Sequence, residues 1–416
     1  MAIKNHPRRT SGAAFRPGRF SAAGLLLIIL CLVPLFAAAE PLSSPRWGFW
    51  LDLPEGYEYS GGDGRDRFSF STADGAVLDV AVYPAGRFTS AANLVADVQR
   101  RLGNSGETSF FTYRDKQAAI LELALPNPQG RGTLTGWGLC IELAAPSGST
   151  GGSRGSAAPP KPMLLALAYG PGGSAALQSL HLSALDSIAP TDADRRYPGP
   201  LTEFAFPREN RIPTPLANSG VQAMIDAIDA EAAQTLVDRE FELLRRSASG
   251  PGWKESWQRF YRMIHRDAYD RLADIAFVLE REWNLQAAAA TAAAGNAAQA
   301  TAAAALRWVQ SFAYERNQMG SDFVNPVTAA VEGRGDCDSR SLLWAIILER
   351  ADIPAAIMVS REYSHAMGLA DIPGTGARFL LDNTRWLVAE TTSPVALGLI
   401  NENTSAVENW IGITFE

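Results

Sequence analysis

The sequence lacks an excess of positive charge. Its 37 Lys and Arg residues are outnumbered by 44 Asp and Glu residues, which gives the 416-residue chain a formal net charge of −7. Residues 1–39 hold five basic side chains and no acid, so the remainder of the chain carries −7 less five, or −12. Proteins that bind nucleic acid by neutralising phosphates need a basic surface. We therefore expect no nucleic-acid partner.

Cysteine and histidine are also scarce, with three and four copies. They show none of the paired spacings of zinc sites, and the Asp336 and Asp338 run lacks the turn glycine and terminal Glu of a calcium loop. We expect no metal and no other cofactor. Beyond residue 39 only Cys140 and Cys337 remain, and we expect two free thiols with different roles. The alternative is a single Cys140–Cys337 disulfide in a redox or regulatory protein.

Apolar residues are plentiful, and one apolar run has the pattern of a targeting signal. Residues 1–39 combine a basic start, an apolar stretch of about 18 residues and a small-residue end, "AAA", which is the pattern of a secretory signal peptide. The stretch is also just long enough for an uncleaved membrane anchor. Either way we predict an extracytoplasmic protein: periplasmic, secreted, or anchored to the outer face of the inner membrane.

Residues 40–190 predict one α+β domain. Alternating apolar residues indicate strands within 46–83, with Asp74-Gly75 as a hairpin turn, and later strands at 109–114, 118–125, 133–144 and 162–169. A helix at 91–102, capped by Thr89 or Ser90 and ended by Gly103, and a last helix before residue 188 should pack on this antiparallel sheet. In strand order and length, this half resembles the PsbP-like α/β sandwich. Cys140 is expected to be a buried small side chain in a strand.

The second half predicts helices followed by strands. Residues 191–218 are rich in Pro and Arg and indicate a linker, and helical periodicity follows at 219–246 and 253–283. We expect Trp253, Trp257, Phe260 and Tyr261 to pack in a helical core and His265 to face solvent. We assign residues 219–416 to one domain, a helical lobe plus a core at about 300–400.

The stretch "GRGDCDSRSLLWAIILER" contains the clearest chemical signal. Asp336 suits a helix N-cap, which places Cys337 in the first turn, where the helix dipole lowers the pKa of a thiol. A strand beginning at His365 and a later strand, "WLVAETT", that carries Glu390 follow. A cysteine on a helix, then a histidine and an acid on antiparallel strands, is the layout of a papain-like triad.

These segments together resemble the transglutaminase-like superfamily of cysteine enzymes, as do "ALRWVQSFAYERN" upstream and "RWLVAETT" downstream. The resemblance implies that Cys337 is the nucleophile, His365 the general base and Glu390 the acidic member, with Asp382 as the alternative acid. It also implies an oxyanion held by the Cys337 N–H and by a donor from Gln310, Tyr314 or Gln318.

The function that follows is an exported cysteine hydrolase or acyltransferase acting on peptide or side-chain amides of a peptide or protein, with proteins of the cell envelope as candidate substrates. Cleavage is favoured over cross-linking, because nothing in the sequence marks a site for a second amine. The alternative is a catalytically inactive transglutaminase-like binding module of the cell envelope.

Overall fold

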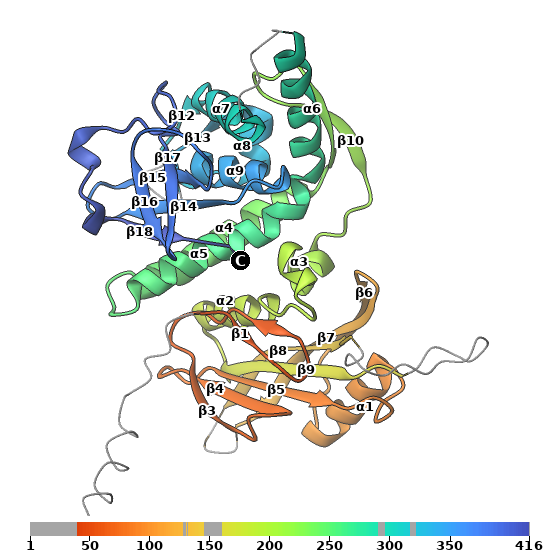
Figure 1. Ribbon diagram of the computed structural model, residues 1–416. Coiled ribbons are helices and arrows are strands. Elements are labelled where there is room, and N and C mark those ends of the chain that lie inside the picture. The colour runs from red at the N-terminus through yellow and green to blue at the C-terminus, as the bar shows by residue number, and fades with distance from the viewer. Residues whose placement is uncertain are drawn as a thin grey trace, which may run out of the picture. The chain divides into compact units, whose positions relative to one another are not determined.

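The computed structural model describes residues 40–127, 130, 132–144, 160–289, 296–316 and 322–415. The predicted signal or anchor segment lies outside these residues, so the structure says nothing of it. Within the described ranges, no helix has both the length and the apolar character needed to cross a membrane. The architecture is mixed α+β with antiparallel sheets, as the sequence predicts (Figure 1).

The first half is built on an antiparallel sheet of seven described strands. In spatial order the strands are β3 (Glu58–Gly62), β4 (Arg67–Ser71), β5 (Val77–Tyr83), β9 (Met163–Pro171), β8 (Thr133–Glu142), β7 (Lys116–Pro126) and β6 (Thr108–Tyr113). A short hairpin, β1 (Leu42–Ser43) and β2 (Trp50–Leu51), precedes it. The predicted strands are therefore confirmed.

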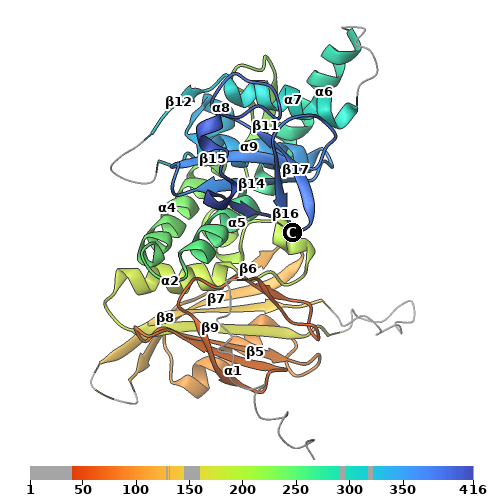
Figure 2. The ribbon, with the colours of Figure 1, turned by 60° about the vertical axis from the view of Figure 1, so that its left-hand side comes forward.

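A helix covers each face of this sheet (Figure 2). Helix α1 (Ala91–Leu102) begins at Ser90, whose side chain accepts the Asn93 N–H, and ends at Gly103 with φ of 61°. Both ends match the prediction, because serine caps helices and glycine adopts positive φ without strain. Helix α2 (Ala175–Asp186) packs on the opposite face, and Cys140 is fully buried beneath α1.

The segment predicted as a linker is folded. It contains the helical turn η1 (Ala193–Arg196), helix α3 (Pro200–Ala205) and strand β10 (Arg211–Pro215). Strand β10 pairs with β11 (Gln222–Asp226), so the helix predicted from residue 219 was wrong over those five residues. The β10–β11 turn includes positive-φ residues Asn218 and Gly220, and β11 buries only part of its side chains. Pairing with β10 therefore makes residues 222–226 a strand, although their local pattern favours a helix.

Helices dominate the next stretch, as predicted. They are α4 (Asp229–Ser247), α5 (Trp253–Arg271), α6 (Ala273–Ala289), α7 (Ala297–Gln310) and α8 (Pro326–Glu332). Asn296 caps α7, because its side chain accepts the Gln299 backbone N–H. A short parallel pair, β12 (Ala313–Tyr314) and β13 (Arg334–Gly335), brackets α8.

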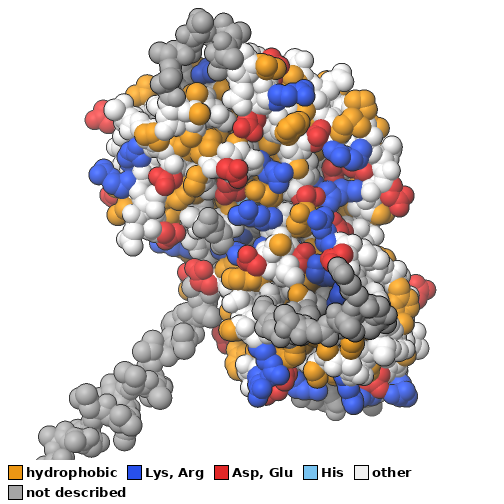
Figure 3. Space-filling view, turned by 45° about the vertical axis from the view of Figure 1, so that its right-hand side comes forward, with side chains coloured by type: hydrophobic (Ala, Val, Ile, Leu, Met, Phe, Trp, Pro, Cys, Tyr) orange, Lys and Arg blue, Asp and Glu red, His pale blue; other side chains and the backbone are white. Residues whose placement is uncertain are grey.

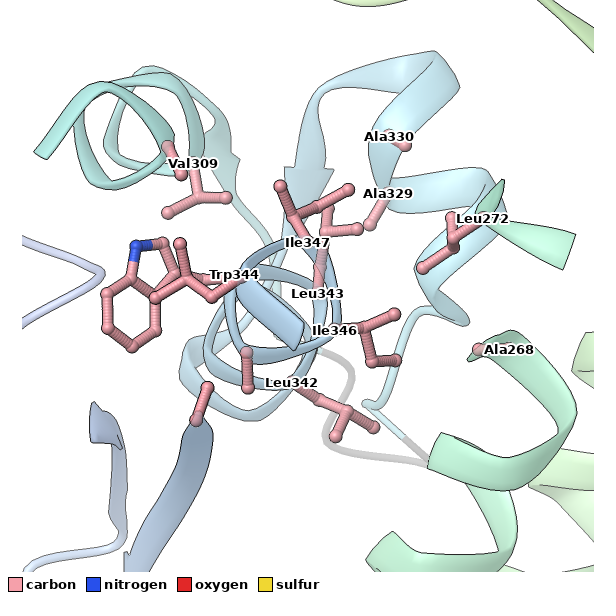
Figure 4. Packing of buried hydrophobic residues seen from close by; sticks show 14 of the residues in the cluster. Ala268, Leu272, Val309, Ala329, Ala330, Leu342, Leu343, Trp344, Ile346 and Ile347 are labelled. Carbon is pink, nitrogen blue, oxygen red and sulfur yellow. The ribbon is translucent and has the colours of Figure 1, made fainter. Parts of the chain in front are cut away.

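Helix α9 (Cys337–Arg350) is the centre of the second half. Its apolar side chains point in every direction, toward Val309 of α7, Ala329 of α8 and Ala268 of α5 (Figure 4). A helix that is apolar all round must be surrounded by other elements. Its fourth side packs on a sheet of order β16-β17-β15-β14-β18. The strands are β14 (Ala355–Ser360), β15 (His365–Ala370), β16 (Arg378–Leu381), β17 (Thr384–Ala389) and β18 (Ile411–Ile413), with helical turns η2 (Glu402–Thr404) and η3 (Val407–Asn409) between the last two strands.

A tight contact fixes α9 against β15. Trp344 is fully buried and its indole N–H donates to the Ala302 carbonyl at 3.1 Å. A Cβ on Gly368 would lie 2.4 Å from Trp344 Cε3, so the indole lies directly on the strand at a position where only glycine fits. This packing sets the start of α9 relative to the start of β15.

Buried arginine side chains of the second half donate hydrogen bonds to groups of the first half. Arg259 of α5 donates to the Asp52 carbonyl, to Glu240 and to Ser183 of α2, and Arg266 donates to the carbonyls of Asp186 and Ile188. The described residues all belong to one compact unit. The boundary predicted near residue 190 is therefore crossed by charged contacts that are shielded from water.

On the face in Figure 3, Lys and Arg side chains alternate with Asp and Glu, and apolar side chains lie between them.

Candidate active site

The cysteine turn is assembled by local hydrogen bonds. Gly335 has φ of 153°, and a Cβ there would lie 2.9 Å from the Cβ of Ser339. Asp336 is the N-cap of α9, and its carboxylate accepts the Ser339 backbone N–H at 2.8 Å and the Ser339 hydroxyl at 2.6 Å. The predicted cap is confirmed, and it places Cys337 at the first position of the helix.

Cys337 and His365 line the same cavity of about 230 Å³. The cavity lies where the start of α9 meets the start of β15, the arrangement that the Trp344–Gly368 packing imposes. Its remaining lining is mixed in charge and aromatic: Trp257, Tyr314, Arg316, Asp322, Asp336, Asp338, Ser360, Arg361 and Ser364.

His365 is paired with Glu390. Its Nε2 lies 2.8 Å from Glu390 Oε2, and the other carboxylate oxygen accepts the Thr392 N–H at 2.8 Å and the Thr392 hydroxyl at 2.6 Å. Because Nε2 makes this bond, Nδ1 is the ring atom that can exchange a proton. The indole of Trp410 contacts the imidazole ring edge to face, with centroids 6.2 Å apart. The ring orientation is thus set from two sides.

The carboxylate of Glu390 is held in its charged form. It is buried, which would raise its pKa, but the hydrogen bond and charge of His365 together with the Thr392 donors outweigh burial and lower the pKa below its ordinary value. A charged acid at Nε2–H keeps the imidazole in the tautomer that a base needs.

The pKa of the Cys337 thiol differs from the prediction. Cys337 is only 5% exposed, and burial, together with the charges of Asp338 and Asp336, raises its pKa well above the ordinary value. The backbone N–H of Ala366 and the charge of Arg316 act in the opposite direction but are weaker. The prediction of a lowered thiol pKa was wrong, because it considered the helix terminus without the tertiary walls around it.

The acids beside the thiol are perturbed too. Burial raises the pKa of both Asp338 and Asp336 above the ordinary carboxyl value. The charge of Asp336 adds to the shift at Asp338, since two carboxylates so close cannot both ionise easily.

The three oxyanion candidates have different positions. Tyr314 lines the cavity. It belongs to strand β12, where it pairs with Gly335, two residues before Cys337. The Gln310 amide donates to the carbonyls of Glu390 at 2.8 Å and Val395 at 2.9 Å, so its N–H groups are already engaged. Gln318 lies outside the described residues.

The alternative acid, Asp382, lies at the tip of the β16–β17 hairpin. Asp382 and Asn383 have φ of 50° and 63°, the backbone of a two-residue hairpin turn. Its side chain is exposed, and the carboxylate bonded to His365 is that of Glu390. The geometry therefore favours Glu390 for the acidic role.

Several neighbours of the site were not foreseen. Trp257, expected in the helical core, lines the cavity, as do Asp322 and Arg361. Their positions depend on how distant segments fold together, and no local pattern marks them. His265 was expected in solvent, but it is 4% exposed, bonded to Glu349 at 2.5 Å and stacked on Phe415 at a centroid distance of 4.0 Å. That prediction was wrong.

The described residues contain no cluster of three or more His, Cys, Asp or Glu side chains arranged to hold a metal. In the described part of the chain both Cys140 and Cys337 are free and buried. The chain was also compared with known proteins: no family model matches it, and no curated protein matches it.

Proposed function

We propose that the chain is a transglutaminase-like cysteine hydrolase or acyltransferase acting on peptide or side-chain amides. The observation that carries the proposal is the shared cavity of Cys337 and His365, with His365 Nε2 bonded to the buried carboxylate of Glu390. A helix that starts at the cysteine and antiparallel strands that supply the histidine and the acid are the parts of a papain-like triad.

In this mechanism the Cys337 sulfur attacks the amide carbonyl carbon while His365 Nδ1 takes the thiol proton. The carbonyl oxygen becomes an oxyanion. His365 then returns the proton to the leaving nitrogen, the C–N bond breaks, and a thioester remains on Cys337. Water attacks the thioester with His365 again as base, and the carboxylic acid product leaves as the thiol is restored.

The raised pKa of Cys337 determines how this nucleophile is activated. A resting thiol of this kind is neutral, so the proton must move to His365 during attack rather than before it. General-base removal is the route used by weakly acidic nucleophiles, and it depends strictly on the distance and orientation of the base. Glu390 supports that step by stabilising the imidazolium that forms.

Tyr314 supplies the second oxyanion donor in this proposal, beside the Cys337 backbone N–H. Tyr314 is the cavity-lining residue among the described candidates, whereas the Gln310 N–H groups are engaged elsewhere. Hydrogen bonds at such a position strengthen as negative charge develops on the oxygen.

The test is acylation of the full-length chain by an activated ester such as p-nitrophenyl acetate. We expect release of p-nitrophenol and a mass increase on Cys337, both abolished by Cys337→Ser and reduced by at least about a hundredfold by His365→Ala. Cys140→Ser is the matched control, because that thiol is also free and buried but belongs to the other half. A folded wild-type chain that forms no acyl-enzyme would contradict the proposal.

Hydrolysis is proposed over cross-linking. Once acylation is established, peptide substrates offered with and without a fluorescent primary amine separate the two outcomes. Cleaved peptide without incorporated amine supports a peptidase, and amine incorporation in proportion to its concentration supports acyl transfer.

The second candidate function is a binding module without catalysis. The raised pKa of Cys337 and its burial favour it, because an inert thiol would have these properties. The acylation experiment distinguishes the two, since a binding module would leave the ester unhydrolysed with its fold intact.

We also propose export from the cytoplasm, on the pattern in residues 1–39. The N-terminal sequence and the fractionation of the protein recovered from cells test both export and the choice between a cleaved signal and a retained anchor.

A further inference from the structure

Glu390 lies just beyond the end of a strand. The pairing of β15 with β17 ends at Gly368 opposite Ala389, so the backbone of Glu390 is outside the sheet ladder. Its carbonyl accepts an N–H from the Gln310 side chain at 2.8 Å, and the same amide nitrogen donates to the Val395 carbonyl at 2.9 Å. One side chain at the last residue of α7 therefore closes the loop 390–395 at both ends.

A second tie holds the same loop to the cysteine helix. The hydroxyls of Ser341 on α9 and Thr391 lie 2.9 Å apart, and both residues are fully buried. Thr391 separates Glu390 from Thr392, whose N–H and hydroxyl bind the Glu390 carboxylate. The loop that carries the acid is thus connected to the helix that begins at Cys337, one turn away from that residue.

We propose that Gln310, supported by the Ser341–Thr391 pair, is a positioning residue that holds Glu390 against His365. This inference builds on the proposed function, in which Glu390 orients the imidazole. The physical reason is that a carboxylate at a strand end has no ladder bonds to fix its backbone, and the amide of Gln310 replaces them. A displacement of about 1 Å in such a group costs on the order of a hundredfold in rate.

The proposal also gives Gln310 a role different from the oxyanion role implied by its resemblance to the family motif. An amide whose two N–H groups bind backbone carbonyls has no donor left for a substrate oxygen. Gln310 acts through Glu390 and does not touch the reacting atoms.

The test uses Gln310→Met in the full-length chain, which keeps the side-chain length and removes both donors. Gln299→Met is the matched control, since Gln299 is an exposed residue of the same helix. A second pair of variants tests the hydrogen bond between Ser341 and Thr391. Thr391→Val removes the hydroxyl at nearly constant shape, and Thr391→Ser keeps a hydroxyl.

Two readouts are compared. The first is the rate of acylation by p-nitrophenyl acetate. The second is the set of ¹⁵N shifts of the imidazole nitrogens in protein labelled only at histidine, which report tautomer and hydrogen bonding. The chain has four histidines, and the buried His265–Glu349 pair is an internal reference for the fold.

We expect Gln310→Met and Thr391→Val to slow acylation by about 10- to 100-fold, to change the His365 nitrogen shifts and to leave those of His265 unchanged. Thr391→Ser and Gln299→Met should behave like the wild type. Unchanged His365 shifts in both Gln310→Met and Thr391→Val would overturn the proposal, as would shifts of His365 and His265 that change together. A wild-type chain that is never acylated would refute the proposed function, while the His365 shifts would still decide whether Gln310 positions the pair.

Discussion

Replacing Arg259 by methionine tests whether the two halves of the chain fold as one unit. The guanidinium donates to Glu240 Oε2 at 2.6 Å, to the Ser183 hydroxyl at 2.8 Å and to the Asp52 carbonyl at 2.8 Å. The Glu240 side chain has no solvent exposure. Removing one partner of a buried ion pair costs about 3–5 kcal/mol because the other charge is left without compensation. Arg239 still donates to the second Glu240 oxygen at 3.0 Å, so we expect the lower end, about 3 kcal/mol.

The assay is urea unfolding of the full-length chain, followed by hydrogen exchange of amides in β7–β9 and in α9. Because Arg259 bridges α2 and α5, we expect both regions to lose protection together in Arg259→Met. The double variant Glu240→Met with Arg259→Met is the control, since removing both charges should recover most of the lost free energy. A cost below about 1 kcal/mol, or a loss of protection confined to one half, would refute the reasoning.

Three further predictions concern the candidate site. Tyr314→Phe should lower the rate of acylation by about a hundredfold with an unchanged far-UV spectrum, as loss of an oxyanion donor does, and a rate within twofold of the wild type would contradict the role. Gly368→Ala should destabilise the chain by about 1–3 kcal/mol in urea unfolding and slow acylation, because its Cβ would lie 2.4 Å from Trp344; a variant as stable as the wild type would show that β15 tolerates displacement. For Cys337, whose pKa is raised by burial, iodoacetamide alkylation should still be increasing with pH where alkylation of the urea-unfolded chain, which has its midpoint at about 8.5, has levelled off. A plateau in the native chain below that of the unfolded chain would show that the thiol is activated at rest.

The same shift has a consequence for stability, and its sign follows from linkage. The folded chain binds the Cys337 proton more tightly than the unfolded chain, so this contribution is fully present below the unfolded thiol pKa of about 8.5. Above that pH the unfolded thiol ionises while the folded one does not, and the contribution decreases.

Much of the fold could be predicted because its signals are local. Ser90, Gly103 and Asp336 are caps or stops whose chemistry depends on a few neighbouring residues, and each has the predicted role. The alternation of apolar and polar residues in a strand such as β4, RFSFS, is also a local signal. Strand β11 could not be predicted this way, because it is a strand only through its pairing with β10.

The residues of the candidate site that belong to a sequence motif could be predicted. Those that reach the cavity only through the folding of distant segments could not. Cys337, His365 and Glu390 are marked by a helix start, a strand start and a strand end. Trp257 reaches the cavity from α5, a helix that ends 66 residues before the cysteine. His265 shows the same limit, since its partner Glu349 lies on a different helix.

The thiol of Cys337 shows why a correct local rule can give the wrong sign. A helix N-terminus stabilises an anion by about 0.3–1 kcal/mol, which is less than one pKa unit at 1.36 kcal/mol per unit. Burial in the cavity wall opposes ionisation more strongly, and Asp338 and Asp336 add repulsion from either side. The sequence displays those two acids, so part of the opposing effect could have been anticipated, whereas the burial could not. Because the thiol is neutral at rest, it needs a base to remove its proton during attack. The His365–Glu390 geometry therefore determines whether Cys337 can react. For that reason the residues that hold Glu390 in place should matter more to catalysis here than they would beside a thiolate already formed.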